Sequence, residues 1–181
     1  MKEELKNLII SNIQQWDEPD IYAISLFVYD ENDNPCKPTV TLGYNTERQV
    51  KNETPNASDE LEARWNYAFW IQNEFFCFGT DETAGCVKDW ILQNGLPYYE
   101  DDEVWNDEEA MEEAEGITER FVDELVEIVQ EIHQKKVLTE KFGKEMPILI
   151  HELEYYDEIL EQNVKANGRQ LTAGFAAFCG E

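Results

Sequence analysis

Basic residues are scarce in this sequence, which has 14 Lys and Arg against 40 Asp and Glu and a formal net charge of -26. Proteins that bind nucleic acid phosphates or anionic membranes use Lys and Arg, because these cations displace counterions from the polyanion. The shortage therefore argues against direct binding to nucleic acid and against binding to a membrane surface. The partner that this charge favours is a basic protein.

Cysteine and histidine are also few, and neither forms a metal-binding pattern. The two histidines, His133 and His151, are far from each other in the sequence. The four cysteines show no C-x-x-C spacing and have no histidine at metal-ligand distance; they are Cys36, Cys77, Cys86 and Cys179. The sequence therefore predicts reduced thiols, no metal site and no cofactor.

Long apolar runs and catalytic motifs are missing as well. No run reaches the roughly 20 residues that a membrane-spanning helix requires, and no apolar signal segment follows Met1. There is no G-x-S-x-G element and no glycine-rich phosphate loop. We therefore expect a cytoplasmic protein that binds a partner rather than an enzyme.

The core-forming residues that are present predict a single α+β domain over residues 1–181. Alternating or β-branched runs indicate a small, mainly antiparallel sheet from Ile21 to Tyr29, Thr39 to Tyr44 and Met146 to Ile150. Helical spacing predicts several flanking helices, at 2–16, from residue 60, at 81–94, at 117–142, at 155–167 and at 171–178. The segment Glu74 to Phe78 is either the end of a helix or a third strand.

An acidic block, EDDEVWNDEEAMEEAE, runs from Glu100 to Glu115 and leads into the helix predicted at 117–142. Ten of its sixteen residues are acidic and none is basic. A few acids would suit the positive end of a helix dipole, but ten exceed that need and repel one another. The block lacks the spacing of a calcium loop. We expect a partner-binding surface made of Asp101, Asp102, Glu103, Trp105, Asp107, Glu108, Glu109, Glu112 and Glu113, with Trp105 as its apolar anchor.

An enzymatic alternative rests on the string HELEYYDE, which begins at His151. It is not the zinc motif H-E-x-x-H, because Tyr155 stands where the second histidine would be. A metal-dependent hydrolase would have to combine His151 with nearby carboxylates, or with His133. The simpler interpretation is that His151 ends a strand and makes local hydrogen bonds.

The segments RWNYAFW, from Arg64, and HELEYYDE, from His151, resemble a bacterial family of unknown function, the 4303 family. The resemblance extends over most of the chain, from the first helix to the last strand and helix. It implies no activity, but it singles out motif positions at Trp65, Asn66, Trp70, His151, Glu152, Tyr155 and Asp157. By analogy of charge and size alone, such acidic domains are similar to immunity proteins that neutralise basic toxins, or to mimics of nucleic acid.

Overall fold

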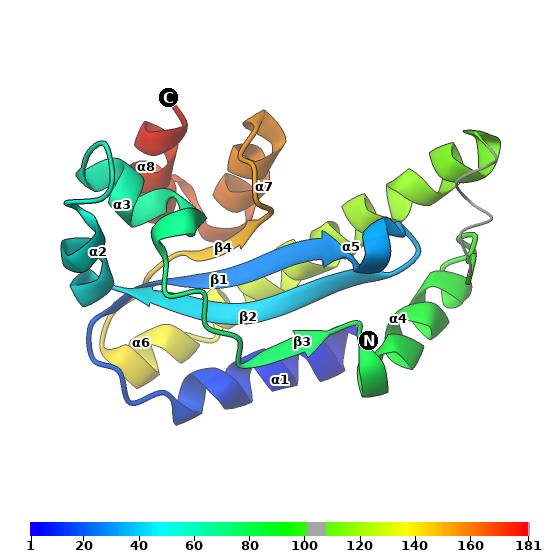
Figure 1. Cartoon of the computed structure of the whole chain (residues 1–181). Coiled ribbons are helices and arrows are strands. Elements are labelled where there is room, and N and C mark those ends of the chain that lie inside the picture. The colour runs from blue at the N-terminus through cyan, green and yellow to red at the C-terminus, as the bar shows by residue number, and fades with distance from the viewer. Residues whose placement is uncertain (101–107, 181) are drawn as a thin grey trace.

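The computed structural model describes residues 1–100 and 108–180, which form an α+β fold around one four-stranded sheet (Figure 1). The fold class predicted from the sequence is confirmed. The strands are β1 (Ile21–Asp30), β2 (Pro38–Thr46), β3 (Phe76–Phe78) and β4 (Ile148–His151). The helices are α1 (Lys2–Gln15), α2 (Glu47–Glu53), α3 (Glu60–Trp65), α4 (Asp81–Gln93), α5 (Glu108–Gln134), α6 (Val137–Phe142), α7 (Asp157–Asn167) and α8 (Arg169–Cys179), with 3₁₀ turns at η1 (Glu31–Asp33) and η2 (Tyr67–Phe69).

The sheet is mixed, in the order β3-β2-β1-β4. Strand β1 pairs antiparallel with β2, and β2 pairs antiparallel with β3, which settles the open assignment of this segment as a strand. Strand β4 pairs parallel with β1, in register from Ile24 opposite Ile148 to Phe27 opposite His151. Parallel neighbours need a long crossover connection, and helix α5 lies within it. The prediction of a mainly antiparallel sheet therefore holds for two of the three pairings.

Each face of the sheet has its own buried cluster. On one face Ile24, Leu26 and Val28 pack into a large core with α1 and α5. On the other face Ala23 and Leu149 belong to a smaller cluster with residues of α2, α3, α7 and α8. Because successive strand residues point to opposite faces, one strand contributes to both clusters.

The single long helix predicted at 117–142 is wrong at both ends. Helix α5 already begins at Glu108, inside the acidic block, and ends at Gln134. Lys136 has a left-handed backbone with φ of 56°, which ends helical geometry before α6 starts. The turn lets α6 pack against both α1 and α5. Within residues 1–100 and 108–180, no helix is both long and apolar enough for a membrane crossing.

Candidate functional site

The segments 64–70 and 151–158 meet around one buried side chain, that of His151. The ring centroids of Tyr67, Tyr155 and Trp70 lie 4.8, 5.9 and 6.1 Å from that of His151. Trp65 continues the cluster, because its ring lies 5.6 Å from Tyr22. Segments almost ninety residues apart in sequence thus form one aromatic packing unit, as the 88-residue separation of the Tyr67–Tyr155 hydrogen bond illustrates.

His151 forms a buried hydrogen-bonded pair with Ser25 of the neighbouring strand. Its Nδ1 lies 3.0 Å from the carbonyl oxygen of Glu152, which can only accept, so Nδ1 carries the proton. The Ser25 hydroxyl then donates to Nε2 over 2.8 Å. Burial lowers the pKa of His151 to about 4, so the ring is neutral near pH 7. Ser25 and His151 are 2% and 1% exposed, which leaves a substrate no access to this pair.

Each of the other motif residues caps a turn, packs against neighbouring side chains or lies at the surface. Asn66 accepts a hydrogen bond from the backbone N–H of Ala68 and so caps η2. Asp157 is the exposed first residue of α7. Only Glu152 combines a motif position with a place at the cleft described below. His151 and the aromatic motif residues therefore stabilise the fold by packing, whereas Asp157 lies on the surface and Glu152 at the cleft.

The geometry gives no support to a metal-dependent hydrolase. Both ring nitrogens of His151 are engaged in the core. His133 is engaged elsewhere, with Nδ1 2.8 Å from Glu145 Oε2 and Nε2 3.0 Å from Asn167 Oδ1. Among the residues that the structure describes, no three His, Cys, Asp or Glu side chains converge in a way that would hold a metal ion.

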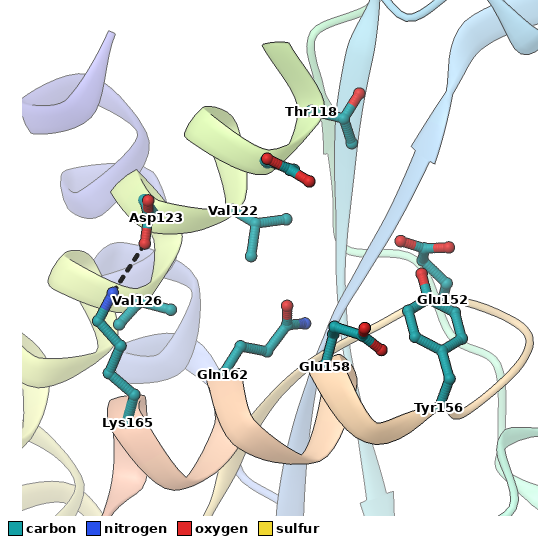
Figure 2. Close-up of a pocket in the computed structure, with 10 residues that line it drawn as sticks. Thr118, Val122, Asp123, Val126, Glu152, Tyr156, Glu158, Gln162 and Lys165 are labelled. Atoms are coloured by element: carbon teal, nitrogen blue, oxygen red, sulfur yellow. Dashed lines mark hydrogen bonds and ion pairs between the residues drawn. The ribbon is translucent and has the colours of Figure 1, made fainter. Parts of the chain in front are cut away.

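A cleft of about 610 Å³ opens between α5 and α7 (Figure 2). Its apolar floor includes Val122, Val126 and the ring of Tyr156. Its lining also carries four carboxylates, those of Glu119, Asp123, Glu152 and Glu158. The one basic lining residue, Lys165, forms an ion pair with Asp123 at 2.8 Å. We call this site the acidic cleft.

Part of the predicted acidic surface continues from this cleft. Glu108, Glu109, Glu112 and Glu113 are exposed on the first turns of α5. With about 3.6 residues per turn, Glu108 and Glu112 share the side of α5 that carries Glu119 and Asp123 into the cleft. The remaining predicted partner-binding residues lie outside the described residues; they are Asp101, Asp102, Glu103, Trp105 and Asp107.

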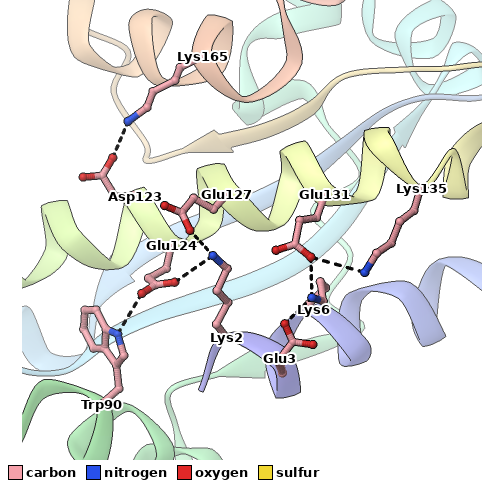
Figure 3. Close-up of polar contacts among 10 residues, drawn as sticks. All are labelled: Lys2, Glu3, Lys6, Trp90, Asp123, Glu124, Glu127, Glu131, Lys135 and Lys165. Atoms are coloured by element: carbon pink, nitrogen blue, oxygen red, sulfur yellow. Dashed lines mark hydrogen bonds and ion pairs between the residues drawn. The ribbon is translucent and has the colours of Figure 1, made fainter. Parts of the chain in front are cut away.

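Another side of α5 has its charges balanced by cations of α1 (Figure 3). Lys2 pairs with Glu127 and lies 3.6 Å from Glu124. Lys6 pairs with Glu131 at 2.6 Å. Two of the scarce cations thus balance carboxylates of α5 along its contact with α1. Glu119 and Glu152 of the acidic cleft have no ion-pair partner among residues 1–100 and 108–180.

Asp30 adds a carboxyl group at the end of strand β1, close to the acidic cleft. Its oxygens accept a hydrogen bond from the Thr118 hydroxyl, at 2.9 Å from Oδ1. Burial, together with the negative charges of Glu152 and Asp33, raises the pKa of Asp30 to about 6, although the hydrogen bond from Thr118 acts in the opposite direction. Burial together with Glu152 likewise raises the pKa of Tyr156 to about 12. Burial is the largest cause of both pKa shifts, and the negative charge of Glu152 adds to each.

Sequence reasoning did not identify Asp30, Glu119 or Asp123 as site residues. The sequence does place Asp30 directly after a buried strand, but its nearness to Glu152 depends on the parallel pairing of β1 with β4. Comparison of the chain with protein-family models, with curated proteins and with solved structures gave no match.

Proposed function

We propose that this protein binds a basic protein partner through the acidic cleft and the adjoining acidic side of α5. The observation that carries the proposal is the cleft itself, where four carboxylates surround an apolar floor and the only lining cation is already paired. Negative charge accelerates association with a cationic partner, and apolar contacts slow the dissociation of the complex.

Exposed apolar side chains beside the cleft support a binding role. Leu153 and Tyr156 are 74% and 47% exposed, although each is large enough to be buried in a core. Both belong to the loop between β4 and α7; Tyr156 lines the acidic cleft, and Leu153 lies beside it, lining a second hollow that also contains Tyr156. Aromatic and apolar side chains surrounded by polar groups are typical anchors of protein interfaces.

One specific role of this kind is that of an immunity protein, because a basic secreted toxin would be attracted to such a surface. A mimic of nucleic acid is another, since its carboxylates would occupy the phosphate sites of a basic protein. The charge supports both forms equally. Membership of the 4303 family belongs to the same proposal and assigns no activity to the chain.

The proposal is tested by capture of partners from a lysate of the source cell on three immobilised proteins. These are the wild type, a variant with Glu108, Glu112 and Glu119 changed to Lys, and a control with Asp89, Glu140 and Glu161 changed to Lys. The control residues are exposed and outside the acidic cleft, and the change in net charge is the same. We expect a basic protein on the wild type and the control, and its loss from the cleft variant.

The captured protein is then purified and its association rate is measured at increasing NaCl concentration. Electrostatic steering predicts a rate at least about tenfold lower for the cleft variant at low salt, with the difference shrinking as salt screens the charges. If the cleft variant and the control lost partner binding equally, binding would depend only on the net charge of the protein and not on the cleft. A partner that is not basic, or no partner, would contradict the proposal.

A further inference from the structure

His133, near the C-terminal end of α5, lies where several parts of the chain meet. It lines a hollow of about 350 Å³ together with Thr139 of α6, Glu145 of the loop before β4, Asn167 of α7 and Leu171 of α8. Both nitrogens of its ring lie within hydrogen-bond distance of a partner. The chemical nature of these partners determines how many protons the ring carries.

The side-chain amide of Asn167 has only one possible orientation. Its Nδ2 donates to the carbonyl oxygens of Ile148 and Asn163, over 2.9 and 3.1 Å, and its Oδ1 accepts from the Ile148 N–H over 2.8 Å. The reverse orientation would place two donors against each other and an oxygen against two carbonyl oxygens. Oδ1 is therefore the atom that lies 3.0 Å from His133 Nε2, and this ring nitrogen donates.

The other ring nitrogen of His133 faces a carboxylate. Nδ1 lies 2.8 Å from Oε2 of Glu145, and Oε1 of the same side chain accepts a hydrogen bond from the Thr139 hydroxyl. Burial acts to raise the pKa of Glu145, but the hydrogen bonds from Thr139 and His133 hold that pKa below its ordinary value. The ionised carboxylate can only accept, so Nδ1 donates as well. With a proton on both nitrogens, the His133 ring is a cation.

Few charged groups surround this ring. Among the described residues that line the hollow, Lys136 is the one other charged residue besides Glu145; it is exposed, and water screens its charge. Helices α6, α7 and α8 contribute uncharged side chains to the lining. On the side of α1, Lys6 pairs with Glu131, which lies two residues before His133 and therefore on a different side of α5. The charge of this contact thus depends on His133 and Glu145.

Loss of one ring proton disrupts the arrangement in either tautomer. With the proton on Nδ1, the lone pair of Nε2 faces Oδ1 of Asn167; with the proton on Nε2, the lone pair of Nδ1 faces the Glu145 carboxylate. The first tautomer is favoured, because its remaining bond is to a charged acceptor. A half-turn of the Asn167 amide then presents Nδ2 to the ring, but it removes both bonds from Asn167 to Ile148.

We infer that the charge of His133 controls how Asn167 holds the edge strand β4. While the ring is a cation, Asn167 binds the N–H and the carbonyl oxygen of Ile148. When the ring loses a proton, the Asn167 amide turns toward it and releases Ile148, which leaves this part of the sheet edge open to water or to another strand. Histidine is the side chain that ordinarily changes charge between about pH 5 and 8, which suits it to such a switch. The inference is independent of the proposed function.

The test compares amide hydrogen exchange at Ile148 and Ile150 by NMR. The Ile150 N–H is held in the same way by Asn163, to which neither histidine is hydrogen-bonded. We expect the protection factor of Ile148 to fall by about tenfold or more relative to that of Ile150 between about pH 5.5 and about pH 8.5. A constant ratio of the two protection factors would overturn the inference.

Nitrogen-15 shifts of the two histidine rings report the protons directly. At about pH 5.5 we expect two protonated nitrogens at His133 and one at His151, whose ring is neutral because burial lowers its pKa to about 4. A neutral ring at His133 at this pH would overturn the inference, because the bond to Asn167 would then not depend on charge.

Glu145→Gln distinguishes the switch from a general loss of structure. The new amide can donate to Nδ1 of a neutral His133 ring, while its oxygen still accepts from Thr139. The single ring proton then stays on Nε2 and faces Asn167. Ile148 should therefore remain protected at about pH 8.5 in this variant. Loss of its protection to the same extent as in the wild type would overturn the inference.

Two further variants are controls. Glu140→Gln removes the same charge from an exposed position outside the hollow and should keep the wild-type dependence on pH. His133→Gln has no titrating ring, so the ratio of the Ile148 and Ile150 protection factors should be the same at both pH values. Loss of the pH dependence in Glu140→Gln, or its persistence in His133→Gln, would overturn the inference.

Discussion

Asn163 of α7 holds both backbone groups of Ile150 in the edge strand β4. Its Oδ1 accepts from the Ile150 N–H over 2.8 Å, and its Nδ2 donates to the Ile150 carbonyl oxygen over 2.7 Å. One turn later Asn167 makes the same pair of bonds to Ile148, at 2.8 and 2.9 Å. The outer edge of β4 is thereby satisfied by side chains, which protects it from pairing with another strand.

Replacing Asn163 with Leu should lower the free energy of unfolding by about 2 kcal/mol, because the Ile150 N–H is left buried without an acceptor. Gln162→Leu is the matched control. It also removes a bond to the Ile150 carbonyl, but that oxygen keeps its bond from Asn163. Urea unfolding should show the larger loss for Asn163→Leu; equal losses would refute the role of the side-chain clamp.

His151 should make stability depend on pH. Its pKa of about 4 in the folded protein lies below the ordinary 6.5, so the unfolded chain takes up the proton first as pH falls. Stability is therefore lost between about pH 6.5 and pH 4. The advantage of the wild type over His151→Phe should shrink by about 2 kcal/mol from pH 7 to pH 5. A constant difference in urea unfolding at the two pH values would show that His151 does not titrate in this way.

Asp30 should have the opposite dependence on pH. Its pKa of about 6 lies above the ordinary 3.8, so folding favours the protonated form, and the stability that this form contributes is lost as pH rises through about 6. Asp30→Asn should therefore be more stable than the wild type at pH 7.5, by about 2 kcal/mol, and no more stable at pH 4. Thermal or urea unfolding at both pH values decides; a less stable variant at pH 7.5 would be evidence against the burial of this charge.

Two helical glycines should respond to alanine with opposite signs. At Gly174 of α8 an added Cβ would lie 2.8 Å from Trp65 Cζ2, whereas at Gly85 of α4 it would meet nothing within 4 Å. Gly174→Ala should cost about 1 to 3 kcal/mol through overpacking. Gly85→Ala should stabilise the protein by up to about 1 kcal/mol, because alanine favours the helix. Destabilisation by both changes would show that the close approach of α8 to Trp65 is not what distinguishes them.

Added salt should raise the melting temperature. At a net charge of -26 the acidic side chains repel one another, and NaCl screens that repulsion. The pairs that Lys2 and Lys6 make with α5 are weakened as well, but they are few beside 40 acids. Differential scanning calorimetry from low to moderate NaCl concentration measures the effect. A melting temperature that falls steadily would mean that the ion pairs outweigh the repulsion.

Local patterns were sufficient to predict several elements. The spacing of Ile117, Phe121 and Leu125 predicts the buried face of α5, and all three are fully buried. Helical spacing predicts a helix from residue 60, and α3 begins at Glu60, where the Asp59 carboxylate accepts a hydrogen bond from the Glu62 N–H. The apolar run from Met146 to Ile150 predicts a strand, and β4 covers Ile148–His151 at the edge of the sheet. These features depend on neighbours within a few residues, so one sequence is enough to reveal them.

The candidate site could not be predicted in the same way. The sequence located the acidic block and, from the block, Glu108 and Glu112 of the acidic side of α5. The sequence did not indicate that Asp30 lies near Glu152. These two residues are brought together because β1 pairs with β4. The two strands are more than one hundred residues apart, and the hydrogen-bonded residues Ser25 and His151 on them are separated by 126 positions.

By itself the sequence determined the fold class, the main helices and strands and the strong negative charge. Only the tertiary structure decided which acids form ion pairs and which do not. Glu127 is paired because α1 brings Lys2 to it across 125 positions of sequence, whereas Glu119, on another side of the same helix, faces the acidic cleft. The physical reason is that electrostatic energy depends on distance in space, and packing sets that distance independently of separation along the chain.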